Sequence, residues 1–242
     1  MDKRVEIAPR KNLLSIMIPV YNEANTLGAV IDRVRAVTVQ EGVHKEIIVV
    51  DDGSTDGTEA ILRTLKDDGI TVVRHPQNRG KGAAVRTALD HATGEWALIQ
   101  DADLEYAPED YPELIAPFLR DPSIGAVFGS RFMGNIEGMM LPNFIANKLL
   151  TWFTNLLFHS RITDLCTGYK LYRTETVREI PLVRDGFDLE HELTAKLLKK
   201  GCNIVDVPIT YTGRDVSAGK KVRWTDFFIN IKTLLKYRFS GI

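Results

Sequence analysis

Short apolar runs alternate along the chain with longer stretches of helical periodicity, and this alternation constrains the fold more than any other feature. Four apolar runs rich in β-branched residues fall at residues 14–20, 46–50, 70–74 and 96–100. Helical patterns follow the first three runs, at residues 24–37, 55–65 and 83–91, with Asn25 or Thr26 as the cap of the first helix. Strands that are apolar on both faces belong to sheets covered by helices on both sides. The pattern therefore predicts an α/β fold with a mostly parallel central sheet.

The rest of the chain continues this pattern without a break. Further strands are expected at residues 126–129, 168–173 and 204–211, and further helices at residues 144–158 and 189–200. No linker-like stretch or internal repeat divides the chain, and 242 residues that are 44% hydrophobic suffice for one large core. We therefore expect a single domain over residues 1–242.

Composition and charge exclude several classes of protein. Lys and Arg number 31 against 32 Asp and Glu, and this formal net charge of −1 argues against a general nucleic-acid binder. Two cysteines, Cys166 and Cys202, are too few for a disulfide scaffold. The most apolar stretch, residues 144–158, is too short to span a membrane, and the charged N-terminus does not resemble a signal peptide. We expect a cytoplasmic protein without transmembrane helices.

Polar sequences follow three of the first four predicted strands. These are PVYNE from residue 19, DDGSTDG from residue 51 and DADLE from residue 101. Ligands of open α/β sheets bind outside the carboxyl ends of the strands. The sequence therefore predicts one site, built from these loops at one edge of the sheet.

The third of these loops carries three carboxylates, Asp101, Asp103 and Glu105, within five residues. Carboxylates this close repel one another unless a cation or solvent neutralises them. Mg²⁺ or Mn²⁺ together with a nucleoside diphosphate would do so, because these hard ions take a few carboxylates plus phosphate oxygens. The alternative is an acidic start to the helix that follows Pro108, where the helix dipole favours negative charge.

The C-terminal segment differs in charge from the rest of the chain. Residues 213–242 carry seven basic and two acidic side chains, so their net charge is +5 and that of residues 1–212 is −6. Apolar residues recur there at helical spacing, and a similar stripe occurs at residues 149–157. We expect a basic amphipathic segment at about residues 214–242, which packs on its own domain or lies at a membrane surface. Two such stripes favour a lipid-facing patch more than one does.

Taken together, the ordered motifs resemble those of inverting family-2 glycosyltransferases of the GT-A fold. They are PVYNE, VVDDGSTDGT, NRGKGAAVRTAL and DADLEY, followed by GSRF, TDLCTGYKLYR, FDLEHELTAKLL and VPITY. The most similar branch is the dolichyl- or polyprenyl-phosphate mannose and glucose synthases. The resemblance implies a metal-dependent enzyme that transfers a hexose from a GDP- or UDP-linked sugar to a lipid phosphate, with Mg²⁺ or Mn²⁺ as cofactor.

The resemblance also implies roles for particular residues. The nucleoside falls on Pro19, Tyr21, Glu23 and Asp52, with Asp101 and Ala102 along the ribose and diphosphate. Asp103 and Glu105 hold the metal, Lys81 binds the nucleotide sugar, and the cationic side chains that face phosphates are Arg131, Arg214 and Lys220. Asp101, Asp103 and Arg131 act most directly in catalysis, since cations stabilise the negative charge that develops on the leaving diphosphate.

Relatives that glycosylate a hydroxyl group carry a Glu-Asp pair at the start of the late helix, with the Asp as base. Here the corresponding stretch is Glu190-His191-Glu192. A phosphomonoester needs no strong base, because its second pKa is about 6 and it is largely dianionic at pH 7. The absence of that Asp favours a phosphate acceptor. Asp188 and Glu190 stay candidates for a base or for the acceptor side of the site.

A lipid-phosphate acceptor would place the protein at the membrane. Many relatives add C-terminal transmembrane helices, whereas no such helix is expected in this sequence. We therefore expect a peripheral enzyme at the cytoplasmic face or one that depends on a membrane-anchored partner. Two other functions stay open: transfer to a soluble sugar, peptide or metabolite, and a catalytically silent subunit that binds nucleotide sugars.

Overall fold

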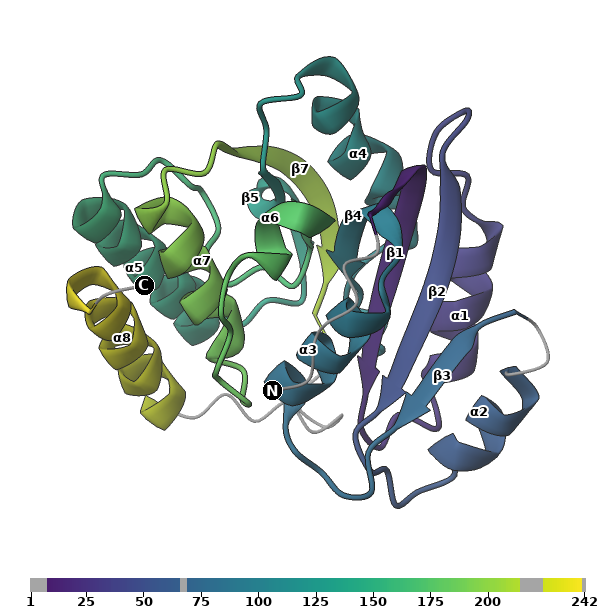
Figure 1. Cartoon of the computed structure of the whole chain (residues 1–242). Coiled ribbons are helices and arrows are strands. Elements are labelled where there is room, and N and C mark those ends of the chain that lie inside the picture. Colours follow the sequence, from purple (N-terminus) through teal and green to yellow (C-terminus); the bar gives the residue numbers. More distant parts are fainter. Residues whose placement is uncertain (1–7, 66–68, 214–223, 241–242) are drawn as a thin grey trace.

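The computed structural model describes residues 8–65, 69–213 and 224–240, and a seven-stranded sheet forms its centre (Figure 1). The strands lie in the order β3-β2-β1-β4-β6-β5-β7. Their bounds are β1 (Arg10–Val20), β2 (His44–Asp51), β3 (Thr71–Arg74), β4 (Gly94–Ile99), β5 (Ala126–Glu137), β6 (Lys170–Arg173) and β7 (Ile204–Thr212). Every neighbouring pair is parallel except those of β6, which runs antiparallel to both β4 and β5. The predicted α/β fold with a mostly parallel sheet is confirmed.

Helices cover both faces of this sheet. Their bounds are α1 (Leu27–Ala36), α2 (Thr58–Leu65), α3 (Lys81–His91), α4 (Tyr111–Arg120), α5 (Leu141–Phe158), α6 (Thr174–Arg178), α7 (Leu189–Lys199) and α8 (Trp224–Phe239). The side chains of α1, α2 and α4 complete the core on one face. Those of α3, α5, α6, α7 and α8 complete a second core on the other. Figure 1 shows α5, α7 and α8 side by side at the end of the molecule away from β3.

Several elements differ from their predicted bounds. The first helix begins at Leu27 rather than at residue 24. Thr26 occupies the N-cap position, as one of the two predicted residues, but its hydroxyl donates to Glu23 Oε2 (2.7 Å) and makes no capping hydrogen bond to the helix. β5 continues to Glu137, well beyond the predicted residue 129, because its second half pairs with β7 from Asn135 onward.

α5 carries apolar side chains on both of its sides: Phe153 and Leu157 of the predicted stripe pack against the core, whereas others lie on the outside of the molecule. Five of its side chains, three or four residues apart, are 49–70% exposed; we call them the α5 ridge, and they are Leu141, Ile145, Leu149, Trp152 and Leu156. The polar side chains opposite face the protein. Thr151 Oγ1 accepts a hydrogen bond from Leu165 N (3.0 Å), and Asn155 Nδ2 donates to Ile162 O (2.7 Å). A surface helix of a globular protein ordinarily keeps its large apolar side chains on the inner side and polar ones outside.

α8 covers most of the described part of the predicted basic segment. Leu234 on this helix is fully buried, whereas Phe228 and Phe239 are 66% and 77% exposed. Lys232 and Lys236 lie on the exposed side with them. None of the helices in the described ranges combines the length and the apolar character that a membrane span requires.

Candidate active site

Two adjoining pockets lie at the carboxyl ends of β1, β2 and β4, where the sequence predicts a site. The β1–β2 pocket has a volume of about 300 Å³, and its lining includes Pro19, Tyr21, Glu23, Asp52 and Ala102. The α5 pocket, of about 420 Å³, extends from the loop after β4 to α5 and includes Glu105, Arg131 and Glu190. Lys81, Asp101, Asp103 and Phe187 line both pockets. The fold thus gathers most of the predicted residues into one continuous site.

Asp52 organises the loop that closes one side of the β1–β2 pocket. Its carboxylate is buried and accepts hydrogen bonds from Arg79 N (3.0 Å), Gly80 N (2.7 Å) and His75 Nδ1 (2.6 Å). Gly80 has a φ of 99°, and a Cβ on it would lie 2.3 Å from Asp185 O, so only glycine fits this position. The sequence predicts Asp52 as a ligand for the base; the structure shows that it also fixes the loop before α3.

Four charged side chains connect the loop after β4 to α7; Lys170 and Glu190 are buried, and Lys81 and Asp101 are partly buried. Lys81 Nζ lies 2.7 Å from Asp101 Oδ1 and 2.8 Å from Glu190 Oε1, and Lys170 Nζ lies 3.2 Å from Glu190 Oε2. Burial alone would raise the pKa of Glu190, but the charges of Lys81 and Lys170 outweigh it and lower the pKa to about 2. The same contacts raise the pKa of Lys81 against the effect of its burial. Glu190 and Lys81 are therefore both ionised at neutral pH.

Arg131 is held by an acid rather than left open to solvent. Its guanidinium makes two hydrogen bonds to the Asp164 carboxylate, at 2.7 and 2.8 Å, and both side chains are buried. Its Cζ also lies 5.2 Å from the centre of the Tyr211 ring. Arg131 also lines the α5 pocket. It would therefore contact a phosphate there, as predicted, while it stays paired with Asp164.

The two predicted metal ligands lie beside each other on the pocket wall. Glu105 N donates to Asp103 Oδ1 (3.1 Å), and Glu105 Oε2 accepts a hydrogen bond from the Tyr211 hydroxyl (2.9 Å). Leu104 between them has a φ of 62°, in the left-handed region that side chains other than glycine rarely adopt. Within the described residues, no group of three or more His, Cys, Asp or Glu side chains is placed to hold a metal ion. This donor set fits Mg²⁺ or Mn²⁺, which bind through one or two carboxylates and complete their coordination with phosphate and water oxygens.

Neither candidate base has the surroundings of a poised base. Asp188 is paired with Arg184 Nε (3.3 Å) and is not part of either pocket lining. Glu190 lines the α5 pocket, but its pKa of about 2 makes it a weak proton acceptor. His191 lies beside it, and burial with the nearby charge of Lys170 lowers the pKa of His191 to about 3, so this imidazole is neutral at pH 7.

Some residues of the site were not assigned a role from the sequence. Asp164 and Lys170 belong to the TDLCTGYKLYR motif, and Phe187 belongs to FDLEHELTAKLL. Their positions in quoted motifs are the signal that could have identified them. Arg214 and Lys220, predicted to face phosphates, lie outside the described residues.

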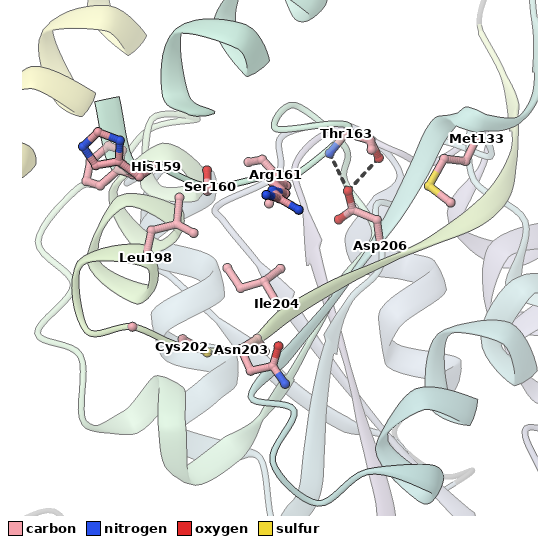
Figure 2. A pocket seen from close by; sticks show the side chains of 13 residues that line it. Met133, His159, Ser160, Arg161, Thr163, Leu198, Cys202, Asn203, Ile204 and Asp206 are labelled. Carbon is pink, nitrogen blue, oxygen red and sulfur yellow. Dashed lines mark hydrogen bonds between the residues drawn. The ribbon is translucent and has the colours of Figure 1, made fainter. Parts of the chain in front are cut away.

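A third cavity, of about 560 Å³, lies between the end of α5, α7 and β7 (Figure 2). Thr163 donates from its backbone N and its hydroxyl to Asp206 Oδ2, the latter at 2.6 Å. Its lining residues do not include any predicted site residue, and it shares none with the other two pockets.

Comparisons with known proteins identify the class to which this site belongs. Residues 15–180 match the model of the family described as "Glycosyl transferase family 2", so the chain belongs to that family. It is 31% identical over 216 residues to the polyprenol monophosphomannose synthase of Mycolicibacterium smegmatis, covering 85% of this chain and 79% of that protein. It is also 31% identical over 208 residues to glycosyltransferase AglJ of Haloferax volcanii, covering 85% of this chain and 65% of AglJ.

Solved structures share the fold. Glucosyl-3-phosphoglycerate synthase of Mycobacterium tuberculosis, crystallised with Mn²⁺, UDP and glucosyl-3-phosphoglycerate, superposes with a TM-score of 0.71 at 22% identity. The match covers 95% of this chain and 81% of that one. The likeness establishes the α/β architecture of this family for the present chain.

Proposed function

We propose that this protein is a single-domain catalyst that transfers a hexose, with inversion, from a nucleotide sugar to a polyprenyl phosphate at the membrane surface. The nucleoside occupies the β1–β2 pocket beside Tyr21 and Asp52, and the diphosphate lies along Asp101, Ala102 and Asp103. The hexose then points toward the α5 pocket, which receives the acceptor phosphate. The names of the two curated relatives support a sugar-transferring role, and that of the M. smegmatis protein supports a polyprenol acceptor and mannose.

The geometry suggests how the chain's own residues assist this reaction. A phosphate oxygen of the acceptor attacks the anomeric carbon, the bond from that carbon to the diphosphate breaks on the opposite face, and the electron pair leaves with the diphosphate. A divalent cation at Asp103 and Glu105 would supply positive charge to the leaving group. Lys81, paired with Asp101 and Glu190, and Arg131, paired with Asp164, place cationic hydrogen-bond donors in the lining of the same pocket. No proton has to be removed, because a phosphomonoester is largely dianionic at pH 7.

The weakness of the available base favours phosphate over hydroxyl as the acceptor. A hydroxyl nucleophile needs a general base with a pKa near the working pH. Glu190 and His191 face the α5 pocket with pKa values of about 2 and about 3, too low for that task. An acceptor that arrives deprotonated removes this requirement.

The two sides of α5 are the observation that carries the lipid part of the proposal. One side of this helix lines the α5 pocket with Asn143, Ala146, Asn147 and Leu150. The α5 ridge lies on its outer side together with the exposed Lys148, and α5 has no acidic residue. The charged head of a lipid-phosphate acceptor would enter the pocket on one side of this helix. Its apolar tail would stay in the membrane that the α5 ridge contacts on the other side. Lys232 and Lys236 on α8 supply positive charge for anionic lipids.

The direct test is incubation of the protein with labelled GDP- and UDP-linked mannose and glucose, Mg²⁺ or Mn²⁺, and a polyprenyl phosphate. We expect a lipid-linked sugar from one of these donors. Product with a soluble phosphate or sugar acceptor, and none with the lipid, would support the soluble-acceptor alternative. Binding of a nucleotide sugar without transfer to any acceptor would support the silent subunit.

A thermal-shift panel of GDP and UDP sugars with Mn²⁺ would identify the donor before the acceptor is known. A ligand at 100 times its dissociation constant adds about 2.7 kcal/mol to the free energy of unfolding. For a chain of this size, that corresponds to a rise in Tm of roughly 5 to 11 °C.

A further inference from the structure

Phe187 is a large apolar side chain that is 76% exposed at the junction of the two pockets. It is the aromatic member of the four residues that line both. The Lys81 ammonium, itself bound to Asp101 and Glu190, lies 5.8 Å from the centre of the ring. The ring therefore stands beside the carboxylates where the proposed donor and acceptor meet.

The backbone that carries Phe187 is fixed, although the ring is exposed. Gly82 N at the start of α3 donates to Asp185 O (2.7 Å). Arg184 N donates to the buried Glu192 carboxylate (2.8 Å). A Cβ on Gly82 would lie 2.5 Å from Arg184 O, so the loop rests directly on the first turn of α3. These contacts fix the position from which the Phe187 side chain extends, and a binding residue needs such a rigid support.

We propose that Phe187 is the platform on which the hexose of the donor rests. The inference rests on the proposed function, in which the nucleoside lies by Tyr21 and the diphosphate by Asp101 and Asp103. The hexose follows the diphosphate toward the α5 pocket, and Phe187 lies at that boundary. The C–H groups on one face of a pyranose are slightly positive and pack well on the negative face of an aromatic ring.

This contact separates sugar binding from nucleotide binding. A platform under the hexose contributes to the affinity for a nucleotide sugar but not for the nucleoside diphosphate, which lacks the sugar. It also orients the anomeric carbon toward the acceptor, so its loss lowers kcat as well as donor affinity.

The test compares Phe187→Ala with the wild type by calorimetry, using UDP, GDP and their glucose and mannose derivatives in the presence of Mn²⁺. We expect a Kd for the bound nucleotide sugar about three- to tenfold higher in Phe187→Ala, the change expected from loss of one aromatic contact. The Kd for the nucleoside diphosphate should change by less than about twofold, and Phe187→Tyr should restore sugar affinity. Val183→Ala is the matched control, because Val183 is 61% exposed on the same loop and lines neither pocket.

Each outcome decides the question. Equal losses for the nucleotide sugar and the nucleoside diphosphate would place Phe187 against the nucleotide and overturn the proposal. An unchanged donor Kd, with a raised KM for the acceptor only, would place it against the acceptor and also overturn it. A wild-type protein that binds no nucleotide sugar at all would contradict the proposed function, and the role of Phe187 with it.

Discussion

Glu190→Gln tests whether the buried charges between β4 and α7 hold the site together. The substitution keeps the shape of the side chain and removes its charge. It leaves Lys81 with Asp101 as its partner, whereas Lys170, whose side chain is fully buried, loses the carboxylate 3.2 Å away. A buried cation without a counter-charge is costly, so we expect a clear loss of stability.

The size of that loss follows from the titration of Glu190. A carboxyl that titrates near 4.5 in the unfolded chain and at about 2 in the folded protein contributes about 3 kcal/mol to the free energy of unfolding at neutral pH. Removal of one partner from a buried ion pair costs about 3–5 kcal/mol by a separate route. We therefore expect a loss of about 3 kcal/mol, or a fall in Tm of roughly 6 to 12 °C for a chain of this size.

The assay is guanidinium unfolding of both proteins at pH 7, with Glu109→Gln as the matched control. Glu109 pairs with Arg33 at 2.6 Å, but the two side chains are 60% and 38% exposed, and exposed pairs contribute about 0–1 kcal/mol. The pKa of Glu190 is depressed, so its contribution is complete above about pH 4.5 and is lost as the pH falls toward 2. The difference between wild type and Glu190→Gln should shrink to about 1 kcal/mol at pH 3. A difference below about 1 kcal/mol at pH 7, or one that is equal at pH 3 and pH 7, would refute this account of the network.

Three further predictions test other parts of the molecule. Asp103→Ala should lower metal-dependent turnover by about 100-fold or more and leave Tm within a few degrees of the wild type; unchanged turnover would contradict the metal assignment. Gly80→Ala should lower the free energy of unfolding by about 2 kcal/mol or more, measured in urea, because its Cβ would lie 2.3 Å from Asp185 O at a φ of 99°. Trp152→Glu should reduce sedimentation with vesicles of anionic and neutral phospholipid at least about tenfold without changing Tm, since this side chain is 63% exposed, and equal sedimentation of both proteins would argue against the α5 ridge as a lipid contact.

Local sequence patterns predict the first half of the fold well because that half is built from repeated local units. Polar loops follow the apolar runs of β1, β2 and β4, and parallel pairing brings those loops to one edge of the sheet. The antiparallel direction of β6 could not be derived in this way. The four residues Lys170–Arg173 carry no information on direction, which depends on the path of the chain through α5 and back.

The predicted residues of the site come together, but the pairings among them could not be predicted from the sequence. Lys81 and Glu190 are 109 positions apart, and Arg131 and Asp164 are 33 apart. The motifs that contain Lys81 and Arg131 do not show whether these side chains contact an acid or face open solvent. The Lys81–Glu190 pair depends on how α3 and α7 approach each other, and the Arg131–Asp164 pair depends on where the segment between α5 and β6 meets β5. No local pattern encodes either approach.

α5 shows a similar limit and also what the structure adds. The spacing of its apolar residues predicts a stripe but not the side on which the stripe lies. Thr151 accepts a hydrogen bond from Leu165 N and Asn155 donates one to Ile162 O, so these polar side chains face the segment after the helix and the α5 ridge lies outside. Burying charges and exposing apolar side chains both oppose stability, and here they occur on the two sides of one helical layer, where α5 packs beside α7. An acceptor that is charged at one end and apolar at the other would bind to both surfaces. The proposed reaction would therefore require both the buried charges and the exposed apolar side chains, although each lowers stability.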